Sequence, residues 1–327
     1  MRDPFALEID RRRFLRRLGI LSAGGFGAAL VACSGSSTGG PGTPAASGPP
    51  GSLSEIASGL RQVSVLSPET PVNPGTQIFT YAIVGTDNRL VTAPSKVYLG
   101  SDPNAKASGP FEGRWYEFTG YAATGDRSPQ SNLTGIYVST IEVDQPGMTT
   151  VVVSADVNGS AVGGSTVLPV TEKPVVAAVG SKAISYRSPV ATTPSARAQI
   201  CTRQPPCSLH SISIDEALRN GRPSVICFAT PLLCESRLCG PTLDEVILVA
   251  QDAGARANAI HIEEFLPGKD LQPPPPQPGN LSPTFKAWGF DDEPWVIVVD
   301  GKGTIRGRLG PGGTVAPEIM HVLQALL

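Results

Sequence analysis

An apolar run that leads into a turn with two cysteines constrains this chain more than any other feature. Residues Ser224–Ala229 form the run, Cys234 follows it, and Cys239 comes five positions later. Short apolar runs between turn residues are typical of buried β-strands, and the residues after Cys239 have the pattern of a helix. The dipole and the unpaired N–H groups of a helix N-terminus stabilise a thiolate. The sequence therefore predicts a strand, a reactive thiol and a helix, in that order.

The spacing of these two cysteines sets a condition on any disulfide between them. On an ideal helix, five residues rise about 7.5 Å and turn about 140°, so the two Cα atoms lie roughly 9 Å apart. A disulfide needs a Cα–Cα distance below about 7 Å. We therefore expect a Cys234–Cys239 bond only if residues 234–238 are irregular or the first helical turn unwinds.

Residues 1–33 carry the pattern of an export signal. The segment Arg11–Leu15 reads Arg-Arg-Arg-Phe-Leu, and the apolar run Leu18–Ala32 follows it. That run is shorter than the roughly 20 residues of a membrane-spanning helix. The arginine motif resembles a twin-arginine signal, and the ending Leu-Val-Ala-Cys33 resembles the lipobox of bacterial lipoproteins. The resemblance implies cleavage before Cys33 and lipidation of its thiol; the alternative is an uncleaved N-terminal anchor helix.

The net charge of the chain and its expected location in the cell limit the partners that it can bind. The chain carries a formal net charge of −2, and residues 1–33 carry +3 (six arginines against three acids), so the remainder carries −5. No basic patch is left for nucleic acid, and we expect no nucleic-acid partner. Either form of the N-terminal segment places the body outside the cytoplasm, anchored to the bacterial cell membrane. Disulfides persist in that compartment, so paired cysteines are expected to be oxidised.

Composition divides the remaining chain into four segments. Residues 34–60, rich in Gly, Ser and Pro, are predicted to be a disordered tether, with a short helical segment from Leu53 to Leu60 at its end. Residues 61–172 hold about seven short strands separated by turn residues, which predicts an antiparallel β-sandwich. Its Asp144-Gln-Pro-Gly step resembles immunoglobulin-like modules, and we expect a spacer or binding domain there. Residues 173–210 form a Pro/Ser/Thr-rich connector, and residues 211–327 show the order βαβ, α, ββ, α of a mixed α/β sheet.

This last segment, with a cysteine at its first strand–helix junction, resembles the thioredoxin-like superfamily. Glu293-Pro294 precedes an apolar strand, as the cis-proline turn of that fold does. The resemblance implies that Pro294 is cis and packs beside the active sulfur. It also implies that Cys234 is the nucleophile and Cys239 the resolving thiol. Arg237 would add positive potential that favours the thiolate, or would be an ordinary solvated arginine.

Three functions fit these residues. We expect a membrane-anchored thiol–disulfide oxidoreductase that acts on extracytoplasmic protein thiols and disulfides with an unknown redox partner and no cofactor. The CxxxxC spacing also resembles the Q-type peroxiredoxins, which makes a thiol peroxidase an alternative. That family places a Thr three positions before the nucleophile, whereas Thr230 lies four before Cys234. The other alternative is a non-catalytic surface scaffold in which Cys234–Cys239 is a static disulfide.

The other cysteines are interpreted as structural. Cys227 lies in mid-strand and is expected to be a small buried apolar residue. Cys201 and Cys207 enclose Thr-Arg-Gln-Pro-Pro, and we expect a structural disulfide between them. The alternative is a second exchanging pair that hands electrons to Cys234. With Cys33 lipidated, five thiols remain, which leaves Cys227 unpaired.

No metal site is expected from the sequence. Copper chaperones of the thioredoxin fold use Cys-x-x-x-Cys with a distant His, and the spacing here differs. The three histidines are His210, His261 and His321. His261 alternates with Ile260 and Ile262 on a strand, so it shares a face with Glu263. We interpret it as a hydrogen-bonded core or surface histidine and not as a metal ligand.

Overall fold

The structure is a computed structural model that describes residues 48–120, 133–234, 236–265 and 281–327. Residues 48–327 form one compact unit. The predicted signal peptide, the lipidation site Cys33 and the first part of the predicted tether lie outside the described residues. Among the residues described, no helix is long and apolar enough to span a membrane.

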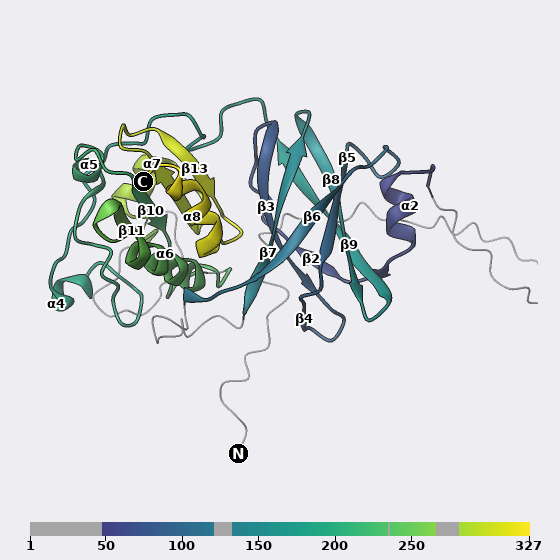
Figure 1. Ribbon diagram of the computed structural model, residues 1–327, viewed down its shortest axis with the longest axis horizontal. Coiled ribbons are helices and arrows are strands. Elements are labelled where there is room, and N and C mark those ends of the chain that lie inside the picture. The colour runs from purple at the N-terminus through teal and green to yellow at the C-terminus, as the bar shows by residue number, and fades with distance from the viewer. Residues whose placement is uncertain (1–47, 121–132, 235, 266–280) are drawn as a thin grey trace, which may run out of the picture. The chain divides into compact units, whose positions relative to one another are not determined.

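The N-terminal β-region (residues 48–172) begins with helix α2 (Leu53–Ser58), which is capped by the Ser52 side chain. Nine strands follow: β1 (Arg61–Gln62), β2 (Ser64–Leu66), β3 (Gly75–Val84), β4 (Leu90–Val91), β5 (Ser95–Gly100), β6 (Ser108–Glu117), β7 (Gly135–Val143), β8 (Gly147–Val157) and β9 (Ser160–Val170). They pair in the order β1-β9-β8-β5-β6-β7-β3-β2, with β4 beside β3 (Figure 1). Residues 53–58 are thus helical, which agrees with the short helical segment expected at the end of the predicted tether.

The sheet of this region closes around its core because β1 and β2, the strands at its two edges, follow each other directly in the chain. β1 pairs in parallel with β9, whereas β2 pairs antiparallel with β3, and only Val63 separates these two short strands. The remaining pairs are antiparallel, as the strand pattern predicted. Alternate residues of β3, β5, β7, β8 and β9 point inward, and Tyr81 stacks on Tyr137 in the core.

The C-terminal region (residues 173–327) holds a separate four-stranded sheet. Its elements are α4 (Pro194–Arg197), α5 (Ile214–Ala217), β10 (Ser224–Phe228), α6 (Cys239–Ala253), η1 (Gly254–Arg256), β11 (Asn258–Ile262), α7 (Pro283–Trp288), β12 (Trp295–Val299), β13 (Ile305–Leu309) and α8 (Ala316–Gln324). The strand order is β11-β10-β12-β13, with β10 parallel to β11 and the other pairs antiparallel. Each predicted strand and helix of residues 211–327 is present, with ends shifted by a few residues.

Helices cover both faces of this sheet (Figure 1). On one face, α6 and α8 pack against Val225, Cys227 and Val296. On the other face, α5 and α7 pack against Ile226 and Phe228. Because successive residues of β10 point to opposite faces and both faces are covered, the strand is apolar throughout. The chain is thus β-rich, with two sheets that have separate cores.

The predicted connector, residues 173–210, is held against the C-terminal region. The N–H of Gly180 donates to the carbonyl of Ile305, and the N–H of Ala183 donates to that of Gly303. Further along, the N–H of His261 in β11 donates to the carbonyl of Leu209 at 2.8 Å. The end of the connector therefore runs along the free edge of β11, which brings Cys201 and Cys207 into the core of this region.

Candidate functional site

Cys234 and Cys239 form a disulfide with a Cα–Cα distance of 6.0 Å. Residues 236–238 are irregular, Arg237 has a φ of +62°, and α6 begins only at Cys239. This geometry confirms the condition set by the five-residue spacing, since a regular helix would hold the two Cα atoms too far apart. The described turn residues show no ion pair for Arg237, and its support of a thiolate stays a prediction.

The environment of the disulfide distinguishes its two sulfurs. The N–H of Cys239, at the start of α6, donates to the Sγ of Cys234 at 3.3 Å, and the Ser236 hydroxyl lies 3.3 Å from the same sulfur. Cys234 is 5% exposed and Cys239 is fully buried. These contacts place the hydrogen-bond donors of the turn on Cys234, which favours its thiolate over that of Cys239.

Glu293, which precedes Pro294, lies beside this pair. The Glu293–Pro294 peptide bond is cis, in agreement with the prediction, and Pro294 is buried immediately before β12. A carboxylate oxygen of Glu293 lies within 4.8 Å of both sulfurs. Burial, followed by the neighbouring carboxylates of Glu264 and Glu263, raises the pKa of Glu293 well above its usual value. A buried carboxyl with a raised pKa thus lies next to the disulfide, and no local pattern in the sequence indicated it.

The N-terminal β-region packs over the turn that holds the disulfide. Leu238 lies in a cluster with Ile136 and Val138 of β7 and with Val315. The carboxylate of Glu245 in α6 accepts hydrogen bonds from the backbone N–H groups of Thr119, Gly120 and Ala316 at 2.5, 2.6 and 2.8 Å. Glu245 is fully buried, so these bonds tie α6 to the β-region.

The expected disulfide between Cys201 and Cys207 is absent from the structure, and both thiols are free. Their sulfurs lie 3.9 Å apart, whereas a disulfide needs about 2.05 Å. The prediction is wrong because it considered only the loop between the two cysteines. In the fold, two imidazoles approach the same sulfurs and supply alternative partners. Cys227, by contrast, is a free, fully buried side chain, as expected.

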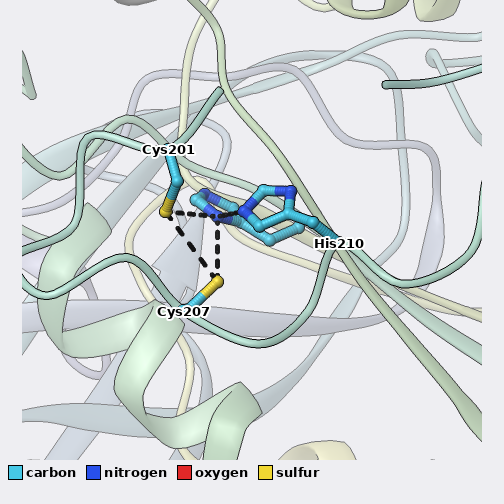
Figure 2. A group of neighbouring side chains, drawn as sticks. Cys201, Cys207 and His210 are labelled. Atoms are coloured by element: carbon cyan, nitrogen blue, oxygen red, sulfur yellow. Dashed lines mark hydrogen bonds between the residues drawn. The ribbon is translucent and has the colours of Figure 1, made fainter. Parts of the chain in front are cut away.

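Cys201, Cys207, His210 and His261 form a buried cluster whose donor atoms all lie within 4.8 Å of one another. His261 Nδ1 is 3.4 Å from the Sγ of Cys207, 3.7 Å from the Sγ of Cys201 and 3.2 Å from His210 Nε2. Figure 2 shows the two sulfurs and the His210 ring turned toward one another. We call these four residues the Cys₂His₂ cluster.

Buried polar contacts hold this cluster in place. The Glu263 carboxylate accepts the N–H of Thr202 at 2.6 Å, and the Thr202 hydroxyl accepts the N–H of Leu232 at 3.2 Å. Arg203 forms an ion pair of 2.9 Å with Asp244 of α6, and both side chains are almost fully buried. The loop between Cys201 and Cys207 is therefore fastened both to α6 and to the turn before Cys234.

The ionisation of the cluster follows from these short contacts. The Cys207 thiol, followed by the imidazoles, lowers the pKa of Cys201 by hydrogen bonding, against the opposing effect of burial. Burial lowers the pKa of His261, but its contact with the Cys201 sulfur and the charge of Glu263 outweigh that effect and raise it to about 9. Burial raises the pKa of Glu263 to about 8.

The four residues were not predicted to form one cluster, although the sequence contains one local signal for it. Cys201, Cys207 and His210 form Cys-x₅-Cys-x₂-His, a compact run of three possible ligands. His261 was considered only with its strand neighbours, and its approach to the other three depends on the pairing of residues 209–210 with the edge of β11. No local pattern predicts that pairing.

Comparisons with known proteins leave the family open. No protein-family model matches the chain, and no curated protein matches it. Among solved structures, domains 4 and 5 of the S-layer protein SbsC are similar, with a TM-score of 0.18 and 15% identity over 34% of this chain and 52% of that chain. The PKD domain of the human receptor SorCS2 has a TM-score of 0.19 and 14% identity over 44% of this chain and 99% of that one. The chain spans about half of the S-layer structure, and similarities this weak carry no argument about function.

Proposed function

We propose that this protein is an extracytoplasmic thiol–disulfide oxidoreductase, anchored to the membrane through Cys33, that acts on protein thiols and disulfides through Cys234 and Cys239. The observation that carries the proposal is the Cys234–Cys239 disulfide at the N-terminus of α6, beside the buried carboxyl of Glu293, the residue before cis-Pro294. Thiol–disulfide exchange requires a thiolate, which a helix N-terminus stabilises, and a nearby group that accepts the proton of the second thiol.

The order of the elements supports a thioredoxin-like domain for residues 211–327. A parallel β10–β11 pair joined through α6 is followed by the antiparallel pair β12–β13 and by α8. The reactive turn follows β10, and cis-Pro294 precedes the adjacent strand β12. The antiparallel strands of residues 61–172 support an immunoglobulin-like spacer or binding domain. The export and lipidation motifs at residues 11–33 support the extracytoplasmic location.

In the reducing direction, the Cys234 thiolate attacks one sulfur of a client disulfide. The client S–S bond breaks, a mixed disulfide forms, and the departing client thiolate takes a proton. The ionised Glu293 carboxylate accepts the Cys239 proton, and the Cys239 thiolate attacks the Cys234 sulfur. The second client thiolate leaves, and the Cys234–Cys239 disulfide forms. Two electrons pass to the client, and the reverse sequence oxidises a client dithiol.

A single assay separates this function from its alternatives. The full-length protein would be given insulin with a thiol reductant, a reduced dithiol peptide, or hydrogen peroxide, with Cys234→Ser as the control. Exchange predicts turnover of insulin or of the dithiol peptide by the wild type only. Turnover of peroxide alone would assign the peroxidase. Absence of turnover in every arm, with a Cys234 thiol pKa near the usual value of about 8.5, would reject exchange and leave a scaffold with a static disulfide.

A further inference from the structure

We propose that the Cys₂His₂ cluster (Cys201, Cys207, His210 and His261) is a structural Zn²⁺ site. The inference does not depend on the activity of the Cys234–Cys239 pair. It rests on the donor atoms, their spacing, the hydrogen bonds behind them and their burial.

The spacing of the donor atoms matches a tetrahedral zinc centre. Zinc binds thiolate sulfur at about 2.3 Å and imidazole nitrogen at about 2.0–2.1 Å. In a tetrahedron with those bond lengths, two sulfurs lie about 3.8 Å apart, a sulfur and a nitrogen about 3.5–3.6 Å, and two nitrogens about 3.3 Å. The corresponding distances here are 3.9 Å between the sulfurs, 3.4 and 3.7 Å from the sulfurs to His261 Nδ1, and 3.2 Å between the imidazole nitrogens.

The hydrogen bonds behind His261 hold a ligating nitrogen toward the sulfurs. His261 Nε2 lies 2.8 Å from the Ala229 carbonyl, to which it donates its proton, so Nδ1 faces the cluster with its lone pair. Zinc-binding histidines are usually oriented by such a bond from the second ring nitrogen. The Glu263 carboxylate, which binds the Thr202 N–H, fixes the loop next to Cys201 in the same way.

Charge balance favours a divalent ion at this buried position. All four side chains are almost fully buried. Binding of Zn²⁺ releases the two thiol protons and leaves two thiolates, two neutral imidazoles and one dication, so the centre has no net charge. An uncharged centre avoids the cost of an uncompensated buried ion. A tetrahedral set of two sulfurs and two nitrogens selects zinc among the common divalent ions.

An entry path leads to the imidazoles. A cavity of about 200 Å³ is lined by Tyr186, Arg187, Pro189, His210 and His261, among other residues. Arg187 and Pro189 are exposed, whereas the two histidines are buried, so the cavity runs from the surface to the edge of the cluster. A metal ion can therefore reach the site in the folded protein.

The test is metal analysis of the full-length protein, produced with added zinc and purified without oxygen. We expect about one zinc ion per chain, and cobalt substitution should give the thiolate charge-transfer and visible bands of tetrahedral Co²⁺. Cys201→Ser, Cys207→Ser and His261→Ala should each lose the bound zinc. His321→Ala, a change at an exposed histidine of α8, and the double variant Cys234→Ser/Cys239→Ser should retain it.

Two further measurements keep the result interpretable if a ligand variant fails to fold. Cys207→His keeps four ligands and should still bind zinc. Glu263→Gln removes no ligand, and we expect it to weaken zinc binding by about 10- to 100-fold. The proposal is overturned if the reduced wild type holds no more zinc than Cys201→Ser. It is equally overturned if mass spectrometry finds a Cys201–Cys207 disulfide in protein purified with zinc present.

Discussion

The backbone N–H of Cys239 donates a hydrogen bond to the Sγ of Cys234 at 3.3 Å, so the first residue of α6 stabilises the sulfur that precedes the helix. The contact exists because residues 236–238 are irregular, with Arg237 at a φ of +62°. A regular helix would direct that N–H toward a backbone carbonyl or water instead. The contact supports the proposed roles, with Cys234 as the nucleophile and Cys239 as the resolving thiol.

From this assignment we expect different outcomes for the two serine variants. Cys234→Ser should abolish exchange, because no thiolate remains at the position that receives the hydrogen bond. Cys239→Ser should still attack a client disulfide and accumulate the mixed disulfide, since nothing resolves it. Mass spectrometry after mixing each variant with a disulfide peptide would detect the adduct. Equal adduct formation by both variants would contradict the assignment.

Glu293 should make stability depend on pH. Burial and the neighbouring carboxylates raise its pKa in the folded state above the unfolded value of about 4.3. The folded protein therefore binds the proton more tightly, and the free energy of unfolding should fall as pH rises from about 4.3 through the folded-state pKa. Glu293→Gln, which cannot ionise, should lessen this fall. Urea unfolding of the wild type and of Glu293→Gln across that pH range would measure the difference. Identical profiles of stability against pH would contradict the prediction.

The same variant tests the mechanism. If Glu293 accepts the Cys239 proton, then Glu293→Gln should slow the resolution step and leave the first attack by Cys234 unchanged. Stopped-flow detection of both steps with a disulfide peptide would separate them. An unchanged resolution rate would show that water or the client takes the proton.

The buried ion pair between Arg203 and Asp244 should be costly to break. Its 2.9 Å contact is almost fully shielded from solvent. Removal of one partner leaves an uncompensated buried charge, so Arg203→Met should lower the free energy of unfolding by about 3–5 kcal/mol. The double variant Arg203→Met/Asp244→Leu should recover part of that loss. Urea unfolding of the single and double variants measures the coupling energy between the Arg203 and Asp244 side chains. Losses in the free energy of unfolding that simply add would show that the two side chains are not coupled.

Gly120 should control how closely the β-region covers the turn of the disulfide. A methyl group at this position would lie 2.3 Å from the backbone of Asp244, so Gly120→Ala must displace the β-region from α6. We expect a loss of about 1–3 kcal/mol in stability and faster alkylation of reduced Cys234. Gly59→Ala is the control, because its methyl meets only the Ile56 carbonyl at 3.8 Å. Equal alkylation rates in both variants would show that this contact does not limit access.

Much of the strand and helix pattern could be predicted because it depends on residues close together in the chain. The alternation of buried and more exposed residues in β5 and the continuous apolar run of β10 are local features. The short helix at the end of the predicted tether shows the limit of this reasoning, because the helix was expected and its burial was not. Residues 53–58 form a helix whose Leu53 is buried, and only contact with the β-region could supply that burial.

The sequence by itself determined that Cys234 and Cys239 could bond only across an irregular turn, because helix geometry fixes the distance between positions five residues apart. It also indicated the order of the longer strands of the β-region and of the strands and helices of residues 211–327. Only the tertiary structure decided which distant residues contact one another at the disulfide and in the Cys₂His₂ cluster. Glu293 lies at the disulfide because β12 pairs with β10, and His261 lies at Cys201 and Cys207 because the connector runs along β11. These pairings join segments distant in the chain, so the free energy that selects them comes from packing of the whole fold.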